Sequence, residues 1–127
     1  MIIADQIPSV MTLLATAAAT KRTVSFSELF SHFQKGTPQS DVYDTLEAAC
    51  AEIANWDVAI YSVLMAKKAT GLPGDGFFDI FRVHREREYR GIAGNAHIVA
   101  LTPEQRKEMV KREKVRVHAH VILLERR

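Results

Sequence analysis

After Pro38 the chain carries an apolar pattern that a helix brings onto one face. Five apolar residues recur there at alternating spacings of four and three, and they are Val42, Leu46, Ala49, Ile53 and Trp56. Such spacing predicts an amphipathic helix whose apolar stripe packs against a core. Gly36 is suited to the left-handed conformation that ends a preceding helix. Thr37 is then expected to cap the new helix, with Pro38 at its first position.

Two more helices are predicted ahead of this break. Apolar residues between Val10 and Ala18 follow a helical spacing, which predicts a first helix over residues 6–20. Ser25 and Glu28 match a capping box, in which each side chain bonds to a free backbone N–H of the other residue. A short second helix therefore begins after Ser25. Two helices joined by a short turn with glycine form the helix-turn-helix pattern.

A strand and a glycine-rich loop are predicted next. Residues 58–65 are rich in β-branched and aromatic side chains, which favours a strand. Glycines and a proline crowd residues 71–76, which marks a loop. Residues 77–82 follow either as the second strand of a hairpin or as the start of a helix, and we favour the strand.

The last third of the chain is predicted to be helical. Residues 86–92 form a short helix ended by Gly91 or Gly94, and a capping box at Thr102 opens a long helix over 103–125. Four apolar residues form a stripe along this helix: Val110, Val117, Val121 and Leu124. The stripe packs either on the chain's own core or on a second copy, and the spacing suits both. We predict a homodimer that uses it.

The order of these elements is that of a winged helix. Residues 23–30, Thr-Val-Ser-Phe-Ser-Glu-Leu-Phe, resemble the helix-turn-helix opening of small bacterial and phage winged-helix domains and of alkyltransferase-like proteins. Residues 70–77, Thr-Gly-Leu-Pro-Gly-Asp-Gly-Phe, resemble a loop of phage and bacterial proteins of that type. The alkyltransferase motif Pro-Cys-His-Arg is missing from the sequence, so that activity is not expected. The predicted fold class is α+β and mostly helical, as a single domain over 1–127. It comprises a winged-helix-like core over 7–82 and a C-terminal helical extension over 83–127.

Charge is divided unevenly along the chain. Residues 1–57 hold three basic and seven acidic side chains, whereas residues 58–127 hold fourteen and eight. The predicted third helix carries four carboxylates and no Lys or Arg, which disfavours the major-groove docking that winged helices use. Basic side chains gather around and after the loop instead, and we predict that they bind a macromolecule: Lys67, Lys68, Arg82, Arg85, Arg87 and Arg90.

Two kinds of macromolecule fit this basic region. We favour a protein partner, because the third helix is acidic. The alternative is a DNA-binding transcriptional regulator that uses the hairpin wing and the basic residues after it. A second interpretation gives these charges no binding role: the alternating charges of residues 85–88 form a solvated helix face with internal ion pairs. The sequence thus predicts a non-enzymatic, cytoplasmic regulatory or interaction protein of phage or mobile-element origin.

No residue pattern identifies a reaction. Cys50 lies within an amphipathic helix without a basic neighbour, which predicts an inert buried thiol, and a lone cysteine favours a reducing compartment. His118 and His120 are two residues apart, so a helix points them in different directions and disfavours a shared metal ion. His84 and His97 have no nucleophile motif beside them. We therefore predict no catalysis, no cofactor, no metal site and no membrane span.

Overall fold

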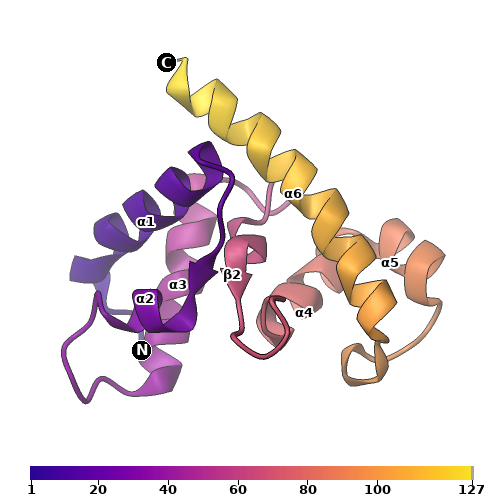
Figure 1. Cartoon of the computed structure of the whole chain (residues 1–127), viewed down its shortest axis with the longest axis horizontal. Coiled ribbons are helices and arrows are strands. Elements are labelled where there is room, and N and C mark those ends of the chain that lie inside the picture. The colour runs from indigo at the N-terminus through magenta and orange to yellow at the C-terminus, as the bar shows by residue number, and fades with distance from the viewer. Residues whose placement is uncertain (127) are drawn as a thin grey trace.

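Helices account for most of residues 1–126, which the computed structural model describes (Figure 1). The α-helices are α1 (Ile7–Ala19), α2 (Phe26–Phe30), α3 (Gln39–Ile53), α4 (Asp75–His84), α5 (Glu86–Ala93) and α6 (Pro103–Glu125). Short 3-10 helices are η1 (Ala4–Gln6), η2 (Tyr61–Leu64) and η3 (Ile98–Ala100), and the strands are β1 (Val24–Ser25) and β2 (Met65–Ala66). The predicted fold class, α+β and mostly helical, is confirmed.

Side-chain caps start α2 and α6 as the sequence predicts. Ser25 Oγ accepts from the backbone N–H of Glu28 at 3.0 Å, and the Glu28 carboxylate accepts from the backbone N–H of Ser25 at 3.3 Å. Thr102 and Gln105 exchange the same two bonds at 3.1 and 2.8 Å. Because these bonds satisfy backbone donors that a helix leaves free, they fix where each helix begins.

The start of α3 differs from the prediction by one residue. Pro38, and not Thr37, occupies the capping position, and no side chain bonds to the first turn. Thr37 instead donates its hydroxyl to the carbonyl of Gln34 at 2.6 Å. Pro38 is extended, with φ −56° and ψ 139°, so the helix begins only after it. Trp56, the last member of the apolar pattern, lies beyond the end of α3.

The strand predicted over 58–65 is mostly replaced by η2. Its end, Met65–Ala66, pairs with β1 in parallel, with Val24 opposite Met65. Every residue of 59–65 is buried, because the segment contacts α1, α3 and α6. A β-branched segment enclosed by helices has no room for a long partner strand. Tertiary packing therefore overrides the local preference.

Residues 77–82 are helical, so the predicted hairpin is wrong. They belong to α4, in which Phe77, Phe78 and Phe81 are all buried. Phe77 and Phe78 pack edge to face with their ring centroids 5.1 Å apart. A helix delivers these rings to the core together, whereas a strand would send Phe77 and Phe78 to opposite faces. Residues 67–74 consequently link a strand to a helix and form no wing.

The core lies where α1 and α3 pack together and η2 runs between them. Leu14 of α1, Ala49 of α3 and Tyr61 of η2 are fully buried. Helix α6 contacts both α1 and η2 on its way across the molecule, and α5 packs on the α6 half nearer its start (Figure 1). The long helix thus ties the N-terminal helices to α4 and α5.

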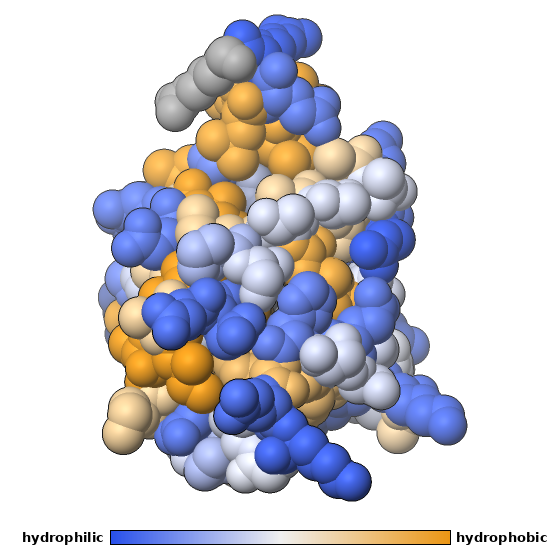
Figure 2. Space-filling model, turned by 90° about the vertical axis from the view of Figure 1, so that its left-hand side faces the viewer, coloured by the Kyte–Doolittle hydropathy of each residue, from blue (hydrophilic) through white to orange (hydrophobic). Residues whose placement is uncertain are grey.

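The predicted dimer stripe of α6 is used inside the chain. Val110, Val117 and Val121 are buried in the same core as α1, and Leu124 is half-buried. These valines are therefore unavailable to a second copy, and the first of the two alternatives holds for them. The end of α6 projects beyond the body of the molecule (Figure 1). Hydrophobic and hydrophilic side chains are mixed over the face that Figure 2 shows. Among residues 1–126, no helix is both long and apolar enough to cross a bilayer.

Candidate functional site

The glycine-rich loop borders a pocket of about 300 Å³ between α3 and the start of α4. Its walls are mainly apolar and come from Phe26, Tyr43, Leu46, Met65 and Phe77. Polar groups also reach it, from Glu47, Ser62, Lys67 and Asp75. Mostly apolar walls with a few convergent polar groups are typical of binding sites, and this volume is at the small end of their range.

A glycine with a positive φ shapes the loop. Gly71 has a φ of 70°, and its N–H donates to the Lys67 carbonyl at 2.7 Å, which turns the chain back on itself. The Lys67 N–H then donates to the Leu72 carbonyl at 2.9 Å. At Gly76 a side chain would bring its Cβ within 3.4 Å of Glu47 Oε1. A Cβ at that distance makes ordinary van der Waals contact, so the start of α4 and the Glu47 carboxylate are neighbours in the pocket wall.

Aromatic rings make one wall of the pocket rigid. Tyr43 meets Phe26 edge to face at 5.9 Å between ring centroids and Phe30 at 6.0 Å. The Gln39 amide also donates to the Tyr43 hydroxyl at 2.6 Å. Tyr43 is nonetheless 36% exposed, so part of its ring is available to a bound molecule. Aromatic side chains of this kind are enriched where proteins bind one another.

Two polar groups of the pocket have no partner within residues 1–126. Ser62 is buried, and its hydroxyl makes no hydrogen bond. Glu47 makes no ion pair, and burial, with help from the Asp44 and Asp79 carboxylates, raises the pKa of its carboxyl. A buried hydroxyl without a partner is unfavourable, so the Ser62 hydroxyl is a polar group in the pocket wall whose hydrogen-bonding capacity is unused.

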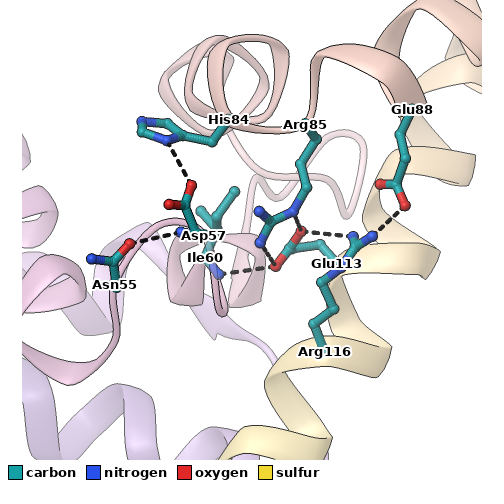
Figure 3. Close-up of polar contacts among 8 residues, drawn as sticks. All are labelled: Asn55, Asp57, Ile60, His84, Arg85, Glu88, Glu113 and Arg116. Atoms are coloured by element: carbon teal, nitrogen blue, oxygen red, sulfur yellow. Dashed lines mark hydrogen bonds and ion pairs between the residues drawn. The ribbon is translucent and has the colours of Figure 1, made fainter.

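Arg85 belongs to the interior and not to the predicted binding surface. Its side chain is 8% exposed, and its guanidinium donates to both carboxylate oxygens of Glu113, at 3.1 and 3.3 Å (Figure 3). Glu113 is fully buried and also accepts from the backbone N–H of Ile60 at 3.0 Å. Burial and the bidentate bond to a buried carboxylate therefore place the Arg85 charge away from the surface that a partner would contact.

Glu113 joins three parts of the fold. Besides Ile60, just before η2, and Arg85, between α4 and α5, it holds Arg116 at 3.1 Å, and Arg116 also contacts Glu88 of α5 (Figure 3). Burial lowers the pKa of Arg116, but Glu88 and Glu113 together raise it above its ordinary value. The sequence holds one signal for this site: Glu113 interrupts the apolar stripe between Val110 and Val117.

The other predicted basic residues divide into two groups. Arg82 pairs with Asp79 at 2.9 Å and Arg90 with Glu86 at 2.8 Å, each within its own helix. These exposed pairs fit the solvated helix face that the charge pattern also allowed. Of the six predicted binding residues, those that make no ion pair in the described part of the chain are Lys67, Lys68 and Arg87. Of these, Lys67 lines the pocket and Lys68 follows it directly.

Cys50 and the histidines lie outside the pocket. Cys50 is buried, and burial followed by the nearby Glu47 raises the pKa of its thiol. His120 contacts the Tyr61 hydroxyl through Nδ1 at 2.7 Å. His84 lies 3.5 Å from Asp57, and His97 accepts from a backbone N–H at the start of η3. No group of three metal-binding side chains occurs within the described residues.

Comparison with protein-family models, curated proteins and solved structures found no match. The chain's own geometry therefore has to carry the functional conclusion. That geometry offers a small, mainly apolar pocket with Ser62 in its wall, the unpaired Lys67 at its edge and Lys68 next to Lys67 in the chain.

Proposed function

We propose that the chain is a non-enzymatic protein that binds a protein partner at this pocket. The partner inserts a tyrosine or tryptophan side chain, and Lys67 and Lys68 contact acidic residues on either side of the inserted residue. One observation carries the proposal: the pocket beside Lys67 is mainly apolar, and its wall includes Ser62, whose buried hydroxyl makes no hydrogen bond within residues 1–126.

The polarity of the pocket selects the inserted side chain. The walls provided by Phe26, Tyr43 and Met65 suit an apolar body. Ser62, which is buried, suits a polar tip such as a phenol hydroxyl or an indole N–H. Buried aromatic anchors supply most of the energy of many protein interfaces, and burying one stabilises the complex by about 1.5–3 kcal/mol. The lysines at the edge add attraction and orientation to that anchor.

The structure weakens the DNA-binding alternative in its original form. That alternative needed a hairpin wing, and residues 75–84 form a helix. It also needed the basic residues after the wing, of which Arg82, Arg85 and Arg90 are engaged by carboxylates of the same chain. A protein partner requires neither the wing nor these arginines.

A displayed peptide library tests the proposal. Each peptide carries a central Tyr, Trp, Phe or Ala with acidic, neutral or basic flanks, and enrichment is measured on the immobilised protein. We expect acidic peptides with Tyr or Trp to be enriched, and Tyr to exceed Phe. Lys67→Glu with Lys68→Glu should remove the acidic preference, whereas Lys35→Glu, an exposed lysine outside the pocket, should not.

A second variant isolates the buried hydroxyl. Ser62→Ala should abolish the preference for Tyr over Phe and leave binding of the Phe peptides unchanged, because only the bond to the hydroxyl is lost. Absence of any enriched peptide, or an unchanged preference for Tyr in Ser62→Ala, contradicts the proposal.

A further inference from the structure

Three lysines line one face of α6 outside the pocket. Lys107, Lys111 and Lys114 are separated by four and three residues, and His118 follows four residues later. These spacings place all four side chains on one side of the helix. At 1.5 Å per residue the row extends for about 16 Å along the helix axis. We call these four residues the α6 row.

The lysines of the row are unpaired, while the arginines of the same helix are not. Arg106 pairs with Asp75, Arg112 with Glu108 and Arg116 with Glu88 and Glu113. Within residues 1–126, no carboxylate forms an ion pair with the three lysines. The arginines stabilise the fold, and the lysines leave their charge on the surface.

Lys21, which follows α1, adds a fourth lysine to this side of the molecule. Lys21 follows the end of α1, held by a φ of 55°, and α1 packs against α6. Burial lowers the pKa of His118, and the charges of Lys21 and Lys114 lower it further, which places both ammonium groups near the imidazole. Two acids share this side of α6: Glu104 lies before the row and Glu125 after it, so they bound the row at its two ends.

We propose that the α6 row with Lys21 binds the phosphate backbone of double-stranded nucleic acid, without reading its sequence. Double-stranded DNA carries one phosphate charge per about 1.7 Å of its axis, so a row of about 16 Å meets a dense array of phosphates. Lysine ammonium groups act on phosphates as point charges and carry no base-reading geometry. Beside the row, the exposed apolar side chain between Lys107 and His118 is Val115, and valine seldom anchors a protein partner. The row and the pocket share no residue, so nucleic acid and a protein partner occupy different surfaces.

Titration of the full chain with a 20-base-pair DNA duplex of arbitrary sequence, and with its RNA equivalent, tests this assignment. The affinity is measured by fluorescence anisotropy at several salt concentrations. Four neutralised phosphates predict a slope of log affinity against log salt of about −3.6. The slope should be the same for a second duplex of unrelated sequence.

Variants of equal charge show where the duplex binds. Lys107→Gln with Lys111→Gln and Lys114→Gln should reduce the magnitude of the slope by about 2.7 and weaken binding at least about tenfold at 0.1 M salt. The triple variant Lys35→Gln, Lys67→Gln and Lys68→Gln removes the same charge elsewhere and should bind as the wild type does. The substituted lysines of both sets except Lys114 are exposed, and circular dichroism checks that the helices persist. The single change Lys111→Gln, which should reduce the slope by about 0.9, serves as a milder test.

Three results would overturn the assignment. The first is no salt-dependent binding to either duplex. The second is equal weakening by the two triple variants, which would reflect overall charge and not the row. The third is equal binding to polyglutamate or to phosphatidylserine vesicles at matched charge, which would make the row a general site for acidic proteins or membranes. The pocket lysines are substituted here only as controls. If the row does not bind nucleic acid, the conclusion of the peptide experiment is unaffected. If no peptide binds the pocket, the conclusion of the duplex titration is unaffected.

Discussion

Among isosteric replacements of the polar residues described above, Glu113→Gln is expected to lower the free energy of unfolding most. Glu113 is 0% exposed and accepts from the Ile60 N–H and from both nitrogens that Arg85 directs at it. Gln keeps the shape of the side chain and one carbonyl oxygen for the Ile60 N–H. It removes the negative charge, so Arg85 is left buried without a charged partner.

The expected loss of stability depends on which charge remains buried without a partner. Removal of one partner from a buried ion pair costs about 3–5 kcal/mol, because the remaining charge is desolvated and uncompensated. Arg116 adds little to this cost, because it is more exposed than Arg85 and keeps Glu88. Against a total stability of about 5–15 kcal/mol for a domain, such a loss lowers the urea midpoint severely.

Urea unfolding followed by circular dichroism and by the fluorescence of the single tryptophan, Trp56, measures this loss. The informative comparison is the double variant Glu113→Gln with Arg85→Met, which removes both charges and keeps the Ile60 bond. We expect the double variant to be more stable than Glu113→Gln alone, since the stranded guanidinium is gone. A cost below about 1 kcal/mol for Glu113→Gln, or additive costs for the two changes, would refute this account of the network.

Three further predictions test burial and charge elsewhere. Val117→Ala should lower the free energy of unfolding by about 2 kcal/mol, and the exposed Val115→Ala by no more than about 0.5 kcal/mol, in urea titrations. A thiol reagent should modify Cys50 only as urea unfolds the chain, because burial shields the thiol and raises its pKa; rapid labelling without urea would contradict this. Lys114→Gln should raise the pKa of His118, followed by NMR titration of its ring, since a neighbouring positive charge is removed; an unchanged pKa would place Lys114 farther away.

Within residues 1–126, the pocket lysines and the lysines of the α6 row differ from most of the arginines discussed because they make no ion pair. Their position along the chain distinguishes them less clearly. The sequence predicts binding by the six basic residues nearest the loop, but the structure engages Arg82, Arg85 and Arg90 with carboxylates. The α6 row is not among these six residues, although it lies in the same basic part of the chain. Its four- and three-residue spacing was a signal that the sequence did contain.

Features set by neighbours along the chain were predictable from the sequence. The capping boxes at Ser25 and Thr102 and the bounds of α6 depend on hydrogen bonds within a few residues. The left-handed glycine after α5, Gly94, depends on the absence of a side chain in one residue. Such contacts form in the same way wherever the segment lies, so the local sequence contains all the information they need.

Features that depend on distant segments were decided by the tertiary structure. Residues 59–65 have the composition of a strand, but helices enclose them and leave them a 3-10 turn and one short parallel pair. Arg85 and Arg87 are indistinguishable in the sequence, yet Arg85 meets the carboxylate of Glu113, 28 residues away, and Arg87 remains on the surface. Burial and the partner of a charge depend on which elements pack together, and the free energy of that packing belongs to the whole chain.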